Sequence, residues 1–307
     1  MHIEHDDADQ LYRSLIKAIM FDGNEIAPRG LLTKEINVLT LRLTEPKYNV
    51  VCDPYRKVNK GFMAAELMWM LDGRCDLDMV KMYNSRMVEY SDDGVTLWGA
   101  YGPKLKPQLK YVYDTLRRDP TSRQAVITIW QESPPPTKDV PCTVMMHFLI
   151  RYGQLHLIVY MRSNDAWFGF PYDLHNFTSI QFVMAALLDV KVGSYNHVAG
   201  SLHLYQSNFD VIENYLAKGA YNRPKLISTP FPDFKVTGED PWIVFEQRLE
   251  WARNMHKTFK ALQTSQLEPY KWQSVTLEIL QYECSFFSQK LLWMCRYIRR
   301  KCETKPS

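Results

Sequence analysis

Apolar residues recur along this chain with two different spacings. Within residues 8–21 they return every three or four positions, which predicts a helix with one buried face. Residues 60–72 and 173–188 are apolar on nearly all sides, so each predicts a helix enclosed by the rest of the protein. Amphipathic stretches at residues 242–263 and 272–300 predict a helical C-terminal region.

Other segments alternate apolar and polar residues or are rich in β-branched residues, as strands are. They are residues 36–44, 123–130, 143–151, 154–161 and 197–206. The alternation changes phase at Val38-Leu39, which indicates a β-bulge in the first of them. Tyr152-Gly153 separates two strands by only two residues and predicts a hairpin turn.

Together these patterns predict a mixed α/β (α+β) fold, in which helices pack on a mixed sheet. The character of the chain changes after Pro230-Phe231-Pro232, beyond which only helical patterns remain. We therefore expect a main domain over residues 1–240 and a C-terminal helical extension over residues 241–307, packed on that domain.

Composition narrows the functional classes. Of the 307 residues, 46% are hydrophobic and 23% are charged, as in folded globular proteins. The net charge of +3 is too small for a protein that coats nucleic acid, so no nucleic-acid partner is expected. No apolar run is long enough to cross a membrane, and the polar start is unlike a signal peptide. A cytoplasmic location without a membrane partner is therefore expected.

Cysteine chemistry centres on Cys142, which follows Pro141 and precedes a predicted strand, where it can face a cleft. A cysteine nucleophile needs partial exposure and a lowered pKa, often from nearby positive charge. The alternative is a small buried hydrophobe, which is the commoner fate of a cysteine and our interpretation of the other five. These are Cys52, Cys75, Cys284, Cys295 and Cys302. No CxxC pair occurs, so no metal site is expected.

A polar cluster follows Cys142 along the chain. Arg162 and Ser163 come directly after a predicted strand and can bind a phosphate, although a surface salt bridge is the commoner role of an arginine. His203 and Tyr205 share one side of a strand and can bind a sugar, or form a half-buried pair without function.

Two carboxylates, Asp165 and Asp173, follow the same predicted strand and complete the set. The alternatives are that Asp165 is a surface cap and that Asp173 is the N-cap of a helix. Each alternative is individually the commoner outcome, but the order and spacing of the whole series favour a nucleotide site.

A collinear series of motifs between about residues 28 and 210 resembles the thymidylate synthase superfamily. The motifs are Pro28-Arg29-Gly30, residues 65–73, Tyr101-Gly102, Asp119-Pro120 with Ser122-Arg123, Pro141-Cys142, residues 162–165, residues 169–173 and residues 201–205. The details around Cys142-Thr143 and residues 161–170 look most like the phage deoxycytidylate hydroxymethylase branch, the pyrimidine-nucleotide hydroxymethylases.

The resemblance implies roles in the reaction and in folate binding for four residues. Cys142 would attack carbon 6 of a pyrimidine nucleotide and make carbon 5 nucleophilic. The co-substrate 5,10-methylenetetrahydrofolate would deliver a one-carbon unit there, without a metal. Glu66 would organise water and proton transfers beside the base and the folate. Asp165 and Gly169 would contact the folate.

The resemblance also implies how the nucleotide is held. Arg29, Arg162 and Ser163 would bind the phosphate, and the enzyme would be a homodimer in which Arg123 reaches the partner's site. His203 and Tyr205 would hold the sugar hydroxyl. Gln124 stands where the family often has a second arginine, so one phosphate contact from the partner is lost or supplied elsewhere.

Asp173 replaces the asparagine that thymidylate synthases carry at this position. Cytosine offers a bare ring nitrogen and an amino group, whereas uracil offers a ring N–H and an oxygen. A carboxyl group can give a proton to the nitrogen and accept from the amine. A mismatched pair leaves buried polar groups unsatisfied at about 1–3 kcal/mol each, so Asp173 favours a cytosine base.

Three further departures favour a hydroxymethyl product, made when water captures the transferred carbon. Met87 or Tyr90 stands near the position of a shielding tryptophan, and Thr143 replaces the usual histidine after the cysteine. The C-terminal residues 301–307 lack the usual folate-covering segment. The alternatives are a CMP hydroxymethylase, a methylating enzyme on dCMP or dUMP, and a non-catalytic nucleotide-binding relative.

Overall fold

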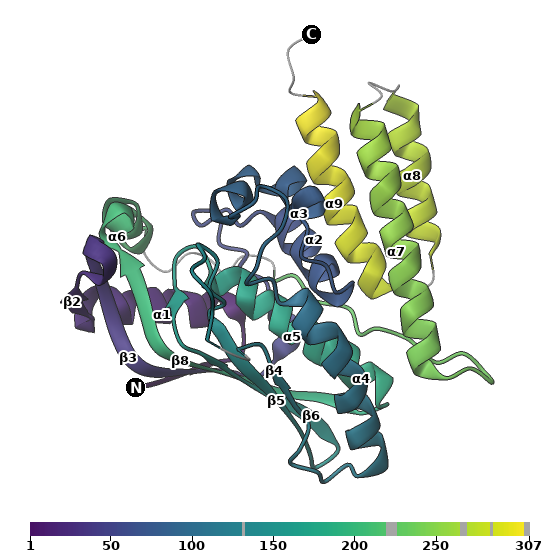
Figure 1. Ribbon diagram of the computed structural model, residues 1–307, viewed down its shortest axis with the longest axis horizontal. Coiled ribbons are helices and arrows are strands. Elements are labelled where there is room, and N and C mark those ends of the chain that lie inside the picture. Colours follow the sequence, from purple (N-terminus) through teal and green to yellow (C-terminus); the bar gives the residue numbers. More distant parts are fainter. Residues whose placement is uncertain (131–132, 219–225, 265–268, 283–284, 304–307) are drawn as a thin grey trace.

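The computed structural model describes residues 1–130, 133–218, 226–264, 269–282 and 285–303. One mixed sheet runs through the described residues in the order β1-β3-β8-β6-β5-β4, with β2 paired to β3 and β7 paired to β8 (Figure 1). The strands are β1 (His2–His5), β2 (Asn24–Ile26), β3 (Thr33–Leu43), β4 (Val126–Thr128), β5 (Thr143–Arg151), β6 (Gln154–Met161), β7 (Asn164–Asp165) and β8 (Lys191–Tyr205). The expected mixed α/β fold is confirmed.

The hairpin and the irregular strand are where the sequence predicts them. Tyr152 and Gly153 have φ angles of 52° and 71°, as the two-residue turn between β5 and β6 requires. Val38 has a φ of 54°, and the β3–β8 pairing passes over it between Asn37 and Leu39. The strand predicted over residues 123–130 is shorter, because only Val126–Thr128 pairs with β5.

Three of the predicted helices lie on one side of the sheet (Figure 1). Helix α1 (Ala8–Asp22) packs on β3, and α5 (Phe170–Leu187) packs on β6 and β8. Helix α2 (Lys60–Leu71) lies on α5. Nearly every residue of α2 and α5 is buried, which explains why their sequences are apolar on all sides.

The shorter helices complete the main body. They are α3 (Leu77–Tyr83), α4 (Gly102–Arg118) and α6 (Phe209–Ala217), with 3₁₀ turns η1 (Pro28–Gly30), η2 (Pro46–Tyr48), η3 (Ser85–Tyr90) and η4 (Gln206–Asn208). Helix α4 packs beside β4 at one edge of the sheet. In the described part of the chain, no helix is long and apolar enough to span a bilayer.

The C-terminal region is a group of three helices beside α2 and α3 (Figure 1). Helix α7 (Pro241–Thr264) matches the first predicted stretch. The second stretch, predicted over residues 272–300, is divided into α8 (Pro269–Gln281) and α9 (Ser285–Glu303), which pack against each other. Helix α9 makes the most extensive contact with the main body, along α2.

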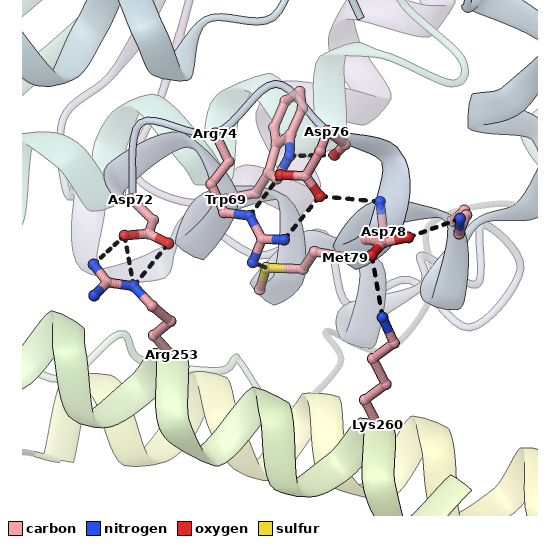
Figure 2. A network of polar contacts seen from close by, with 9 residues as sticks. Trp69, Asp72, Arg74, Asp76, Asp78, Met79, Arg253 and Lys260 are labelled. Carbon is pink, nitrogen blue, oxygen red and sulfur yellow. Dashed lines mark hydrogen bonds and ion pairs between the residues drawn. The ribbon is translucent and has the colours of Figure 1, made fainter. Parts of the chain in front are cut away.

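Ion pairs fasten α7 to the segment that follows α2 (Figure 2). The guanidinium of Arg253 donates through Nε to both carboxylate oxygens of Asp72, over 3.0 and 3.1 Å, and Lys260 pairs with Asp78. A bidentate arginine–carboxylate contact restrains orientation as well as distance. The extension therefore has a defined docking position on the body.

Candidate active site

Six of the predicted site residues line one cavity of about 620 Å³. They are Arg29, Cys142, Arg162, Ser163, His203 and Tyr205. These residues come from η1, from the segment before β5, from the end of β6 and from β8. The cavity is large enough for a nucleotide, and its lining joins a thiol to several cationic and hydroxyl groups.

The thiol of Cys142 lies beside the guanidinium of Arg162. Nη2 of Arg162 is 3.8 Å from Sγ, while Nε donates to the Pro141 carbonyl over 3.0 Å and Nη2 to the Val140 carbonyl over 3.1 Å. Arg162 thus holds the segment that carries the cysteine. Burial raises the pKa of the Cys142 thiol, and Arg162 opposes that rise. The lowered pKa expected for a cysteine nucleophile is therefore not found at Cys142.

The cationic end of the cavity includes a strained residue. Arg29 has φ 56° and ψ 27°, in the left-handed region, and Gly30 follows with φ 77°. A non-glycine residue in this region stores strain, which is typical of functional sites. Arg29 is exposed and interacts with the hydroxyl of Tyr205, so its guanidinium is directed into the cavity rather than away from it.

His203 and Tyr205 lie together, as their spacing on β8 predicts. Their rings are 5.0 Å apart and nearly perpendicular. Burial lowers the pKa of His203, and the nearby carboxyl of Asp165 opposes that change. Both residues line the cavity that Cys142 and Arg29 also line.

Two carboxyl groups lie deeper, on facing helices. Glu66 of α2 and Asp173 of α5 are half-buried. Desolvation raises the pKa of Glu66 to about 7 and that of Asp173 to about 8, and in Asp173 the charge of Glu66 adds to the rise. Asp173 also raises the pKa of Cys142, so the carboxyl and the thiol lie within electrostatic reach of each other. The carboxyl of Asp173 and the thiol of Cys142 also both raise the pKa of the Tyr101 hydroxyl.

Two asparagines that we did not single out hold these carboxyls. Nδ2 of Asn164 donates to Asp173 over 2.7 Å, and Nδ2 of Asn176 donates to Glu66 over 2.7 Å. Asn176 is three residues after Asp173 on α5, a spacing that could have indicated a shared face. Oδ1 of Asn164 is buried without a partner among the described residues, which leaves an acceptor for a ligand.

Like Glu66 and Asp173, three further predicted residues lie outside the cavity lining. Oδ1 of Asp165 accepts from the backbone N–H groups of Trp167 and Phe168 over 2.8 and 3.0 Å, so this carboxyl caps a turn. Gly169 opens α5, and a Cβ there would stand 3.1 Å from the Asp165 carbonyl. Arg123 is exposed in the segment before β4.

The residues on which the predicted hydroxymethyl product depends do not all lie at the cavity. Tyr90 lines the cavity, whereas Met87 is not among its lining residues. Thr143 is buried, and its Oγ1 has no hydrogen-bond partner among the described residues. The prediction for residues 301–307 falls partly on residues 304–307, and Cys284 also lies outside the described residues.

Comparison with known proteins identifies the relationship. Residues 10–239 match the sequence model of the thymidylate synthase family, which is most of the chain. The chain belongs to the thymidylate synthase family.

One relative from the hydroxymethylase branch bears on the details. The chain is similar to a deoxyuridylate hydroxymethyltransferase of Bacillus phage SP01, with 35% identity over 220 residues. The aligned region covers 65% of this chain and 57% of the relative's length. The resemblance of this chain to thymidylate synthases, and to their hydroxymethylase branch, is thereby confirmed.

Proposed function

We propose that this thymidylate synthase family member transfers a one-carbon unit to carbon 5 of a pyrimidine nucleoside monophosphate and releases a 5-hydroxymethyl product. The observation that carries the proposal is the convergence of Cys142, Arg162 and His203 on one cavity, with Glu66 and Asp173 close behind. Family membership and the hydroxymethyltransferase relative support the same reaction class.

The phosphate is bound at the cationic end, by Arg29, Arg162 and Ser163. Charge-assisted hydrogen bonds from guanidinium groups contribute about 1.5–3 kcal/mol each. His203 and Tyr205 bind the sugar hydroxyl from the wall of the same cavity. This places carbon 6 of the base toward the thiol of Cys142.

Sγ of Cys142 adds to carbon 6 as a thiolate, which makes carbon 5 nucleophilic. Because burial raises the thiol's pKa, Arg162 stabilises the thiolate at the moment of attack. Methylenetetrahydrofolate supplies the one-carbon unit, and Asp165, Gly169 and Glu66 are the residues that hold it. Glu66, with a pKa of about 7, can take and return a proton near neutral pH.

The hydroxymethyl product forms when water adds to the methylene at carbon 5 of the base and the Cys142 sulfur leaves carbon 6. Thr143 and Tyr90, as departures from the thymidylate synthase pattern, support this outcome over reduction to a methyl group. Release of tetrahydrofolate rather than dihydrofolate distinguishes the two outcomes.

Asp173 favours cytosine as the base, and dCMP as the substrate. Its raised pKa keeps the carboxyl neutral at pH 7, so it can donate to the bare ring nitrogen and accept from the amino group. The second candidate is dUMP, favoured by the deoxyuridylate specificity in the relative's name. A neutral carboxyl can also accept from the uracil N–H and donate to its oxygen. The ribonucleotide CMP remains a third candidate.

We further propose a homodimer formed through the sheet face opposite the helices, with Arg123 reaching the partner's site. This face presents partly exposed apolar residues, including Ile158, Tyr160 and Val198 on adjacent strands. Residues 1–240 would form the catalytic domain and residues 241–307 the helical extension packed on it, in a cytoplasmic enzyme.

Incubation of the purified protein with methylenetetrahydrofolate and dCMP, dUMP or CMP, each separately, tests the proposal. We expect exchange of the carbon-5 hydrogen into solvent and a product heavier than the substrate by one hydroxymethyl group in place of hydrogen. Absence of exchange and product with all three nucleotides would overturn it.

A further inference from the structure

Helix α9 of the extension carries a lysine into the interior of the main body. Lys290 is fully buried, and its Nζ lies 2.9 Å from Nε2 of His175 on α5. Nζ also lies 4.6 Å from the ring centre of Trp293 and 5.2 Å from that of Phe286. Burial lowers the pKa of Lys290 to about 7. Lys290 has no carboxylate partner within the part of the chain that the structure describes. Burial of such a lysine is unfavourable for folding, which calls for a functional reason.

A continuous series of hydrogen bonds joins this lysine to Glu66. Lys290 contacts Nε2 of His175 over 2.9 Å, Nδ1 of His175 contacts Oδ1 of Asn176 over 3.3 Å, and Nδ2 of Asn176 donates to Glu66 over 2.7 Å. His175 and Asn176 are both buried. The series therefore runs from the extension to the candidate catalytic carboxyl without passing through solvent.

The chemistry of the donors gives the series one direction. Lysine has no acceptor when charged, so Nε2 of His175 accepts and the ring proton resides on Nδ1. Nδ1–H then donates to Oδ1 of Asn176, which leaves the Asn176 amide to donate to Oε2 of Glu66. Each orientation depends on the one before it. Lys290 thus determines that the Asn176 amide turns its N–H toward Glu66, where it stabilises the ionised form of that carboxyl.

The packing around α9 keeps the lysine in place. A Cβ at Gly61 of α2 would stand 2.5 Å from Tyr297 of α9, so only glycine admits this close approach. The amide of Gln289, beside Lys290, donates to the Ser228 carbonyl over 3.1 Å. Helix α9 also packs on α7, and the ion pairs in Figure 2 hold α7 to the main body.

We propose that Lys290 is a positioning residue for Glu66, acting through His175 and Asn176. The extension then has a part in the reaction, because it orients the carboxyl that moves protons beside the base. This inference rests on the proposed function for its catalytic consequence, but the hydrogen-bond series can be tested without turnover.

The titratable and charged groups around the series are few. Among the described residues, Glu66 of α2 faces Asp173, Tyr172 and Asn176 of α5. Lys290 of α9 faces His175 of α5 and the uncharged side chains of Gln289, Trp293 and Phe286 on its own helix. In the described residues of α2, α3, α7 and α8, no charged side chain is recorded in contact with Lys290. A shift in Glu66 titration on changing Lys290 is therefore attributable to the series.

The decisive variant is Lys290→Met, which keeps the length of the side chain and removes the donor. His175 can then carry its proton on Nε2, and the Asn176 amide can turn its oxygen toward Glu66. We expect the pKa of Glu66 to rise by about one unit, because its carboxylate loses a donor and faces an acceptor. Lys290→Gln retains an N–H donor and should restore part of the shift.

Two readouts on the full chain are needed. Nitrogen-15 NMR of the His175 ring reports its tautomer, and carbon-13 NMR of the Glu66 carboxyl, assigned with Glu66→Gln, reports its pKa. Lys257→Met is the matched control, because Lys257 is an exposed lysine of the same extension. The pH profile of carbon-5 exchange should shift by the same amount as the Glu66 titration.

The outcomes separate the two proposals. A changed tautomer and a shifted Glu66 titration in Lys290→Met but not Lys257→Met support the positioning role. If both readouts are the same in Lys290→Met and the unmodified protein, the positioning role is wrong. If the unmodified protein catalyses no exchange while the NMR changes occur, the proposed function fails and the link from Lys290 to Glu66 stands.

Discussion

Nδ2 of Asn164 lies 2.7 Å from Oδ2 of Asp173, so an amide rather than a cation holds the carboxyl that we assign to base recognition. An arginine or lysine there would keep Asp173 ionised. Burial and the charge of Glu66 instead raise its pKa to about 8, and the hydrogen bond from Asn164 opposes that rise only in part. Because Oδ2 accepts from Asn164, Oδ1 is left to carry the proton toward a ligand.

The first prediction concerns the base. Asp173→Asn should lower kcat/KM for dCMP relative to dUMP by at least tenfold, because an amide N–H cannot be transferred to the ring nitrogen of cytosine as the carboxyl proton of Asp173 can. The measurement is carbon-5 exchange with both nucleotides in each protein. An unchanged ratio would show that position 173 does not read the base.

The pH dependence of dCMP turnover follows from the same group. In the unmodified protein, kcat/KM for dCMP should fall as the pH rises above about 8, because Asp173 then loses the proton that it donates. Asp173→Asn should lack this decline while keeping any dependence due to Glu66. If both proteins decline with the same midpoint, another group is responsible.

Stability should change with pH in the same variant. The folded pKa of Asp173, about 8, is above its ordinary value of 3.8, so its contribution to stability is full below 3.8 and is lost as the pH rises to about 8. Asp173→Asn should therefore match the unmodified protein near pH 4 and be about 1–3 kcal/mol more stable at pH 8.5. Thermal unfolding at both pH values measures the difference; a gap at pH 4 as large as that at pH 8.5 would contradict it.

The elements around the cavity were predictable because their patterns are local. The apolar residues of α2 and α5 reflect burial on all sides, and Tyr152-Gly153 can adopt the positive φ angles of a two-residue turn. The division between α8 and α9 was missed because helical periodicity continues through residues 272–300.

The roles of Asn176 and Lys290 were not predictable from local patterns. Their contacts join positions that are 110 and 115 residues apart in sequence, to Glu66 and His175 respectively. The raised pKa of Cys142 is likewise a consequence of tertiary burial, which the sequence around Pro141 does not reveal.

Two arginines of the cavity should respond differently to replacement by lysine. Arg29→Lys should raise KM for the nucleotide by about tenfold with little change in kcat, since lysine binds phosphate as a point charge and loses bidentate geometry. Arg162→Lys should lower kcat as well, because Arg162 also holds the Pro141 and Val140 carbonyls beside Cys142. Steady-state kinetics on both variants distinguishes the two roles, and equal effects on KM alone would contradict the positioning of Cys142 by Arg162.

The last prediction is that Lys290→Met makes the protein more stable. The folded pKa of Lys290, about 7, is below its ordinary value of 10.5, so the folded state binds fewer protons than the unfolded state between these values. Stability of the unmodified protein therefore rises with pH across this window, and the disadvantage of the buried lysine is complete below pH 7. Lys290→Met should be about 1–3 kcal/mol more stable at pH 7, and the gap should narrow by pH 9.5.

Thermal unfolding of Lys290→Met, Lys257→Met and the unmodified protein at both pH values measures this difference in stability. A gap that does not depend on pH would mean that Lys290 is not the group that titrates. A stabilised variant with a displaced Glu66 titration would show that the extension retains this lysine for the reaction and not for folding.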